Sequence, residues 1–214
     1  MKSILICIET LCGRISPAGF GSKEDRRHLE RAREQTDASL LGAGSLRAGD
    51  PEFRTFEGKL PVNRLRAIVT RSGNIPATKS IFRTGPRPLI FTKFSIRDML
   101  NERFGERAEV IGVPETDSGM LCLKTILDNL EQRGVESCLI EGGGLLNYEA
   151  FKQGVVTELL LTIAPKIIGK QTETCLVSGP TALGTPFIHL ELLSCRMNAR
   201  SGELFLHYKI LDRR

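Results

Sequence analysis

The sequence lacks the groupings of residues that mark a protein metal site. Its six cysteines, at positions 7, 12, 122, 138, 175 and 195, form no C-x-x-C pair. The three histidines, at positions 28, 189 and 207, do not group with the cysteines in the sequence. Structural zinc sites and the zinc motif of nucleobase deaminases both need ligands at short, regular spacings. The sequence therefore predicts no metal site.

Long apolar runs are also missing. No apolar stretch approaches the roughly 20 residues that a membrane-spanning helix needs. The short apolar run at residues 4–8 meets Glu9 too early to form a secretory signal. We therefore expect no membrane partner and a cytoplasmic protein whose thiols are reduced.

The charge distribution lacks the features of a nucleic-acid-binding protein. The chain has 30 Lys and Arg against 25 Asp and Glu, a formal net charge of +5. The basic residues are scattered, and no basic tract with interleaved aromatic residues is found. A mild positive excess suits anionic small molecules, because their phosphates are drawn into a basic cleft. We predict a phosphorylated small-molecule ligand and no nucleic-acid partner.

The patterning that is present predicts a single α/β domain over residues 1–214. With 41% hydrophobic residues, a chain of this length can bury one core. Apolar runs typical of strands alternate with helical patterns, at residues 2–8, 37–41, 66–70, 88–92, 109–112, 137–140 and 155–163. Two further runs, at 187–196 and 203–210, flank a turn typical of a hairpin. We expect a mostly parallel central sheet with helices on both faces and an antiparallel C-terminal hairpin.

Helix starts are indicated by local capping patterns. Ser22 and Asp25 form a Ser-x-x-Asp pattern before a charged helix that runs to about residue 36, and Ser95 and Asp98 repeat the pattern later. Apolar residues recur with a helical period over residues 118–133, directly before a glycine. These patterns predict three helices with defined ends.

Three predicted strand ends carry glycine together with Ser, Thr or a carboxylate, at residues 42–45, 70–73 and 141–144. Ligands of open α/β sheets bind beyond the carboxyl ends of the strands, so the three turns can converge on one phosphate-bearing molecule. Glycines let backbone amides approach a phosphate closely, and the following helix N-terminus attracts anions. The same pattern also occurs as a plain tight turn, so residues 141–144 alone leave both interpretations open. The G-x-G-x-x-G spacing is absent, which argues against a conventional Rossmann fold.

Three ordered motifs make the chain similar to a known enzyme family. They are Gly-Ala-Gly-Ser-Leu-Arg at 42–47 with Asp-Pro at 50–51, Leu-Ile-Glu-Gly-Gly-Gly at 139–144, and Ala-Pro-Lys-Ile-Ile-Gly at 164–169. Together they resemble the reductase domain of bacterial and archaeal riboflavin biosynthesis, which has a dihydrofolate-reductase-like fold. The resemblance spans nearly the whole chain. It implies that NADPH reduces the ribosyl group of a phosphoribosylamino-pyrimidine to ribityl, in an enzyme that is commonly a homodimer.

The resemblance also implies which residues bind the two ligands. For NADPH, it implies the nicotinamide half at Gly44 and Ser45, the adenosine 2′-phosphate at Arg71 and Ser72, and the diphosphate at Gly142, Gly143, Gly144, Leu145 and Leu146. For the substrate, it implies Arg33, Phe53, Arg54 and Glu141 around the phosphoribosyl group. Arginine pairs well with phosphate, and a carboxylate with sugar hydroxyls. Neither the resemblance nor the sequence singles out a proton donor.

Two positions depart from the pattern of the family. Cys12 and Gly49 stand where family members typically carry Asp, although Asp50 adjoins the second position. The departures leave two alternatives open: a dihydrofolate-reductase-like oxidoreductase of another substrate, and a catalytically silent nucleotide-binding subunit. We expect Cys12 to be a small buried residue and His28 a solvated surface residue. The sequence does not distinguish an oxo from an amino group on the pyrimidine.

Overall fold

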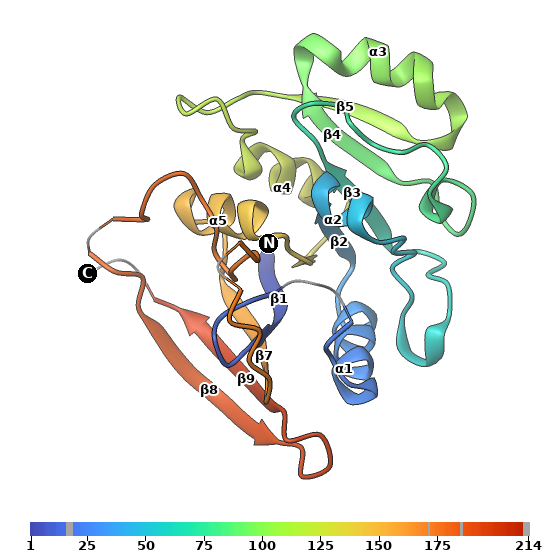
Figure 1. The fold of residues 1–214 in the computed structure, drawn as a ribbon. Coiled ribbons are helices and arrows are strands. Elements are labelled where there is room, and N and C mark those ends of the chain that lie inside the picture. Colours follow the sequence, from blue (N-terminus) through green and yellow to red (C-terminus); the bar gives the residue numbers. More distant parts are fainter. Residues whose placement is uncertain (16–18, 171, 185, 212–214) are drawn as a thin grey trace.

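The protein is built around one central β-sheet. The computed structural model describes residues 1–15, 19–170, 172–184 and 186–211, and nine strands in these residues form a single sheet. In chain order they are β1 (Lys2–Thr10), β2 (Ala38–Gly42), β3 (Leu65–Val69), β4 (Leu89–Lys93), β5 (Glu109–Val113), β6 (Ser137–Ile140), β7 (Glu158–Ala164), β8 (Leu190–Met197) and β9 (Leu204–Ile210). Their order across the sheet is β5-β4-β3-β2-β6-β1-β7-β9-β8 (Figure 1).

The strands from β5 to β7 are parallel to their neighbours, whereas β9 runs antiparallel to both β7 and β8. The predicted parallel sheet with an antiparallel C-terminal hairpin is thus confirmed. The α-helices are α1 (Lys23–Glu34), α2 (Ala43–Ala48), α3 (Phe94–Phe104), α4 (Leu123–Gln132) and α5 (Gly144–Lys152). Short 3-10 helices lie at Phe56–Gly58, Ser80–Phe82 and Gly105–Arg107.

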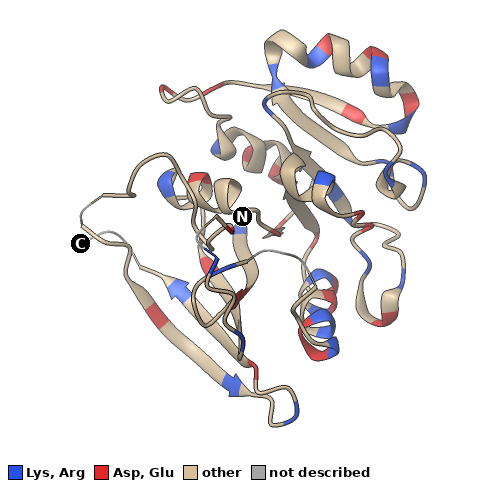
Figure 2. Cartoon of the chain, viewed as in Figure 1, with Lys and Arg blue, Asp and Glu red and all other residues tan. Residues whose placement is uncertain are grey.

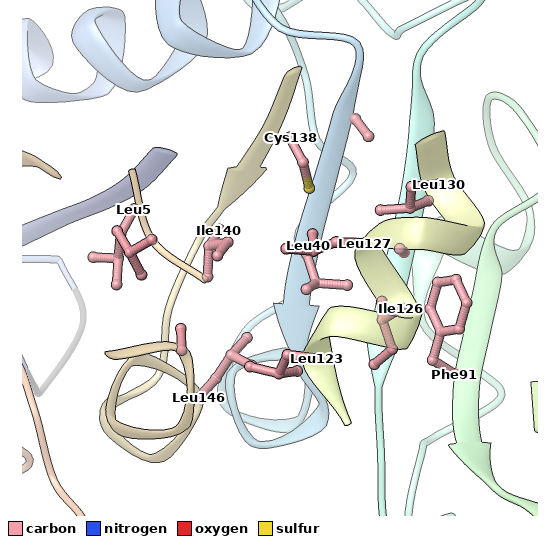
Figure 3. Close-up of a cluster of buried hydrophobic side chains, with 14 of the residues drawn as sticks. Leu5, Leu40, Phe91, Leu123, Ile126, Leu127, Leu130, Cys138, Ile140 and Leu146 are labelled. Carbon is pink, nitrogen blue, oxygen red and sulfur yellow. The ribbon is translucent and has the colours of Figure 1, made fainter. Parts of the chain in front are cut away.

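Helices cover both faces of the sheet, because successive residues of a strand point to opposite sides. Leu40 of β2 packs in a cluster with Ile126 of α4 and Leu146 of α5 (Figure 3). Its neighbour Leu41 packs on the opposite face, in a cluster that contains Leu46 of α2 and residues of α3. A third cluster joins α1 to β1 and β6. The expectation of helices on both faces is confirmed.

The first predicted helix cap is half right and the second is wrong. Ser22 Oγ accepts hydrogen bonds from the amides of Glu24 and Asp25, as a capping serine does. The Ser22 amide, however, donates to Glu203 Oε1 at 2.9 Å rather than to Asp25. Helix α3 begins at Phe94 without a side-chain cap, so Ser95 lies inside the helix.

The helical period over residues 118–133 overstated the length of α4. The helix begins at Leu123, and the residues before it form a tight turn closed by an antiparallel bridge between Glu115 and Leu121. Gly119 has a φ of +71° in this turn. Because Met120 and Leu121 are apolar, their spacing matched the helical period although the glycine turns the chain.

Charged residues of both signs are mixed over the surface. Both basic and acidic residues occur along α1 and along α3 (Figure 2). None of the helices in the described part of the chain has the length and apolar character that crossing a bilayer requires. The described residues also contain no group of three or more His, Cys, Asp or Glu side chains placed to hold a metal ion.

Candidate functional site

A cleft of about 1310 Å³ lies at the carboxyl ends of adjacent parallel strands. It is lined by the ends of β3 and β2, by the loop after β6, and by the middle of β1. The carboxyl ends of parallel strands share one edge of the sheet, which is why the glycine turns after β2, β3 and β6 meet here. The convergence expected from the sequence is therefore observed.

The cleft brings together every predicted binding residue except Gly142 and Phe53. Those that line it are Arg33, Gly44, Ser45, Arg54, Arg71, Ser72, Glu141, Gly143, Gly144, Leu145 and Leu146. Gly142 lies beneath this surface, where its carbonyl accepts a hydrogen bond from Ser45 Oγ at 3.3 Å. Phe53 is fully buried, with its ring centroid 5.5 Å from the guanidinium carbon of Arg33. The Phe53 ring packs against the guanidinium group of Arg33 and does not line the cleft.

The turn from β6 to α5 has a backbone that only glycine adopts without strain. Gly142 and Gly143 have φ values of +76° and +95°. A Cβ on Gly143 would lie 2.9 Å from Ser45 Oγ, and a Cβ on Gly144 would lie 2.6 Å from Thr174 Cγ2. Helix α5 begins at Gly144 without a side-chain cap, so no capping side chain accepts from the first amides of the helix. The amides at the start of α5 are donors of the kind that bind a diphosphate, and the segment from Thr174 to Ser178 packs directly against Gly144.

A buried ion pair joins α1 to the end of β6. Arg33 donates from Nε to Glu141 Oε1 at 2.9 Å and from Nη2 to Glu141 Oε2 at 2.5 Å. Their side chains are only 3% and 5% exposed. Burial by itself would raise the pKa of Glu141, but the charge of Arg33 and hydrogen bonds from Arg33 and Ser39 bring this pKa below its ordinary value. Glu141 is therefore a carboxylate held in one orientation.

Sequence reasoning missed the residues that support this ion pair. Ser39 donates a hydrogen bond to Glu141 Oε1, and the buried Arg64 donates to Ser39 Oγ at 2.8 Å. Arg54, also at the cleft, is partly neutralised by Glu52 at 2.8 Å. Asp50 lines the cleft beside Gly49, and its two carboxylate oxygens accept hydrogen bonds from the Ser80 amide and hydroxyl at 2.8 and 2.7 Å. No local sequence pattern indicates that Ser39 would contact Glu141, which lies 102 residues away in the sequence.

A further carboxyl group that the sequence presented only as a helix cap also lines the cleft. Asp25, Leu29 and Arg33 recur every four residues, so they form one row along α1 facing the cleft. Burial raises the pKa of Asp25 to about 6; a hydrogen bond with Thr162 opposes this shift and the nearby Glu203 adds to it. Asp25 is thus a carboxyl group that changes charge near neutral pH.

Cys12 and His28 do not lie where they were expected. Cys12 is exposed, not buried, and its Sγ accepts a hydrogen bond from the Ile168 amide at 3.4 Å. Hydrogen bonds from the Gly169 backbone, the Thr10 side chain and the Ile168 backbone lower the pKa of Cys12 to about 7. His28 packs edge-on against Phe205, with ring centroids 5.0 Å apart. Neither residue lines the cleft.

The exposed thiol leads to a direct prediction. Iodoacetamide is expected to alkylate Cys12 about tenfold faster at pH 8 than at pH 6, because the thiolate is the nucleophile and its pKa is near 7. Cys138, buried and with a pKa raised by burial to about 12, serves as the internal control and should stay unmodified in the folded protein. Peptide mass spectrometry over time measures both rates. Equal rates at the two sites would contradict the described surroundings of Cys12.

Comparisons with known proteins match this architecture. A model of the RibD C-terminal domain family matches residues 5–200. A 2,5-diamino-6-ribosylamino-4(3H)-pyrimidinone 5′-phosphate reductase of Archaeoglobus fulgidus is 29% identical over 171 residues, covering 75% of this chain and 76% of that protein. The reductase of the same name from Methanothermobacter thermautotrophicus is 28% identical over 184 residues, covering 82% and 83% of the two chains.

Solved structures share the fold. A pyrimidine reductase-like protein of Corynebacterium diphtheriae superposes with a TM-score of 0.79 at 23% identity, covering 99% of this chain and 92% of that one. Dihydrofolate reductase of Enterococcus faecalis superposes with a TM-score of 0.55 at 13% identity, covering 99% and 97%. These likenesses confirm the dihydrofolate-reductase-like fold. The family model matches most of the length of this chain, and the chain therefore belongs to the RibD C-terminal domain family.

Proposed function

We propose that the protein is an NADPH-dependent reductase that converts the ribosyl group of a phosphoribosylamino-pyrimidine to ribityl in riboflavin biosynthesis. Family membership supports this proposal, and so do the names of the relatives. The observation that carries it is the presence in one cleft of an uncapped glycine turn and a buried Arg33–Glu141 pair. In this proposal residues 1–214 act as a single reductase domain.

The glycine turn is the proposed diphosphate site of NADPH. Main-chain amides at the start of α5, in the segment from Gly142 to Leu146, would donate to its oxygens. Gly44 and Ser45 would contact the nicotinamide half, and Arg71 and Ser72 the adenosine 2′-phosphate. Arg71 is anchored at the cleft by a hydrogen bond from Nη1 to the Gly119 carbonyl at 2.9 Å. When bound, this cofactor supplies the hydride.

The substrate residues are proposed to orient the sugar phosphate. Glu141, an oriented carboxylate, would accept hydrogen bonds from sugar hydroxyls, and Arg33 and Arg54 would attract the phosphate. Phe53 would act indirectly, by holding Arg33 in place. The ribosyl ring opens to an imine, and the reaction adds a hydride to C1′ and a proton to the nitrogen of its C1′=N double bond; positioning with exclusion of water supplies much of the rate.

A cofactor-oxidation assay tests this function. NADPH absorbance is followed with each of the two pyrimidine intermediates, the diaminopyrimidinone and the corresponding uracil, and with neither. The proposed enzyme oxidises NADPH only when one of the pyrimidines is present. A divergent oxidoreductase of another substrate and a catalytically silent nucleotide-binding subunit would both leave NADPH unoxidised with either compound.

We further propose that the protein is a homodimer joined through β8. All residues of this edge strand are exposed, including Leu190, Leu192, Leu193 and Met197. Exposed apolar edge strands readily pair with an identical strand of a second copy, which would cover both the side chains and the free main-chain groups.

The variant Leu192→Lys tests the dimer. Two lysines per symmetric interface are expected to weaken dimerisation at least about 100-fold, because each apolar contact is replaced by a charge. Analytical ultracentrifugation over a range of concentrations measures the dissociation constant. Val62→Lys, at a residue that is 82% exposed outside β8, is the matched control. A wild-type protein that stays monomeric at high concentration would rule out the dimer.

The cytoplasm is the proposed place of action. All six cysteines are unpaired in the structure. Free thiols of this number, one of them exposed with a lowered pKa, are typical of a reducing compartment.

A further inference from the structure

The cleft extends past the sugar-binding residues along β1 and the first turns of α1. Here its walls are Ile6 and Ile8 of β1 and Leu29 of α1, and Asp25 lies at the far end of the same row as Arg33. At 1.5 Å per residue, Asp25 lies about 12 Å along the helix from Arg33. If Arg33 and Glu141 bind the sugar phosphate, this apolar extension is where the pyrimidine base would lie.

The carboxyl group of Asp25 is oriented by its neighbours. Its backbone amide donates to Ser22 Oγ at 3.2 Å, and its side chain is hydrogen-bonded to Thr162, which is 1% exposed. Gly21 leaves the space for it, since a Cβ there would lie 2.6 Å from Asp25 Oδ2. The carboxyl group therefore occupies a defined position at the cleft wall.

The charged groups around Asp25 are bound to other partners. Arg26, on the same helix, pairs with Glu30 at 2.8 Å. Glu203, which precedes β9, accepts hydrogen bonds from Ser22. The Cys7 thiol of β1 is neutral at physiological pH, because burial raises its pKa to about 12. Among the residues that the structure describes, no basic side chain is bonded to Asp25, so its carboxyl group is available to a ligand at the cleft wall.

An ionised carboxylate only accepts hydrogen bonds. A pyrimidine with an amino group at C2 and a hydrogen on the adjacent ring nitrogen presents two neighbouring donors, which match the two carboxylate oxygens. A uracil presents an oxo group at C2, so an acceptor would face an acceptor. Buried polar groups left unpaired in this way are the basis of strong discrimination between substrates.

We propose that Asp25 is the specificity-determining residue for the base and that it selects a 2-aminopyrimidinone over the corresponding uracil. This inference rests on the proposed reductase function and states which of the two intermediates the cleft accepts. Ile6, Ile8 and Leu29 contribute the apolar contacts to the ring, and Asp25 supplies the contacts that distinguish the two bases.

The charge of Asp25 should make the substrate preference depend on pH. Above pH 6 the Asp25 carboxyl is ionised and accepts from the 2-amino group. Below this pH the carboxyl group is protonated, and its O–H can donate a hydrogen bond to the oxo group of a uracil. The preference for the amino compound should therefore be largest above pH 7 and fall as the pH drops through 6, with Arg26, Glu203 and Cys7 as the neighbouring titratable groups.

The test compares kcat/KM for the two pyrimidine phosphates in the wild type and in Asp25→Asn, at pH 8 and pH 5.5. We expect the wild type at pH 8 to prefer the amino compound by about 100-fold or more, the scale set by an unpaired buried polar group. The asparagine variant offers one acceptor and two donors, so its preference should shrink to within about tenfold, chiefly through KM for the amino compound. Its affinity for NADPH should not change.

Controls separate the outcomes. Asp98→Asn removes the same charge from α3, where the side chain is 81% exposed, and should leave the preference unaltered. Asp25→Ser repeats the test if the asparagine variant does not fold. A wild type that prefers the uracil, or an unchanged preference in the folded Asp25 variants, would overturn the inference and leave the reductase function standing. A wild type that oxidises NADPH with neither pyrimidine would instead overturn the proposed function.

Discussion

Replacing Arg33 with methionine is expected to lower the free energy of unfolding by about 3–5 kcal/mol. The substitution keeps much of the side-chain volume but leaves the carboxylate of Glu141 buried without its bidentate partner. Removing one member of a buried ion pair is costly, because the remaining charge keeps its desolvation penalty and loses its compensation. Urea unfolding at pH 7, followed by circular dichroism, measures the difference.

Two variants make this measurement specific. Arg27→Met lies on the same helix and removes an exposed pair with Glu24, whose side chains are 55% and 37% exposed, so its cost should stay below about 1 kcal/mol. The double variant Arg33→Met, Glu141→Leu removes both charges and should recover much of the lost stability. A single-variant cost below 1 kcal/mol at Arg33 would show that the pair is solvated.

The same pair sets a pH dependence. Because the pKa of Glu141 in the folded protein lies below its ordinary value of 4.5, the stability from the pair is present above pH 4.5. It is lost as the pH falls through the folded-state pKa, since protonation discharges the carboxylate. The stability difference between wild type and Arg33→Met should therefore shrink as the pH is lowered below 4.5.

Replacing Gly144 with alanine is expected to weaken NADPH binding by about 100-fold or more, which corresponds to about 3 kcal/mol. The new Cβ would lie 2.6 Å from Thr174 Cγ2, 2.7 Å from the carbonyl oxygen of Cys175 and 2.9 Å from Ser178 Cβ. A backbone carbonyl cannot rotate away as a flexible side chain can, so the segment over the start of α5 must move. Isothermal titration calorimetry measures the dissociation constant.

Gly49→Ala is the matched control for this substitution. Gly49 also lines the cleft, but a Cβ there would lie 3.7 Å from its nearest neighbour, an ordinary contact distance. Its affinity for NADPH should stay within about threefold of the wild type, a difference below 1 kcal/mol. A folded Gly144→Ala protein with unchanged affinity would remove the glycine turn from the cofactor site.

The strand pattern and the positions of the glycine turns could be predicted from the sequence because both depend on local chemistry. Apolar runs of four to nine residues form strands, and glycines after them permit positive φ, as at Gly142 and Gly143. Parallel connectivity then puts the turns on one edge of the sheet. The start predicted for α4 was wrong because local apolar spacing was read as helix. Gly119 turns the chain there, although the apolar residues around it recur with a helical period.

What the sequence by itself determined is the order of strands and helices, the glycine turns and the family to which they belong. The tertiary structure alone decided the partners of the polar groups. Arg33 and Glu141 are 108 residues apart in the sequence, and Asp25 of α1 is hydrogen-bonded to Thr162 of β7. The charge, the burial and the pKa of such groups depend on what surrounds them in space, and no local pattern carries that information.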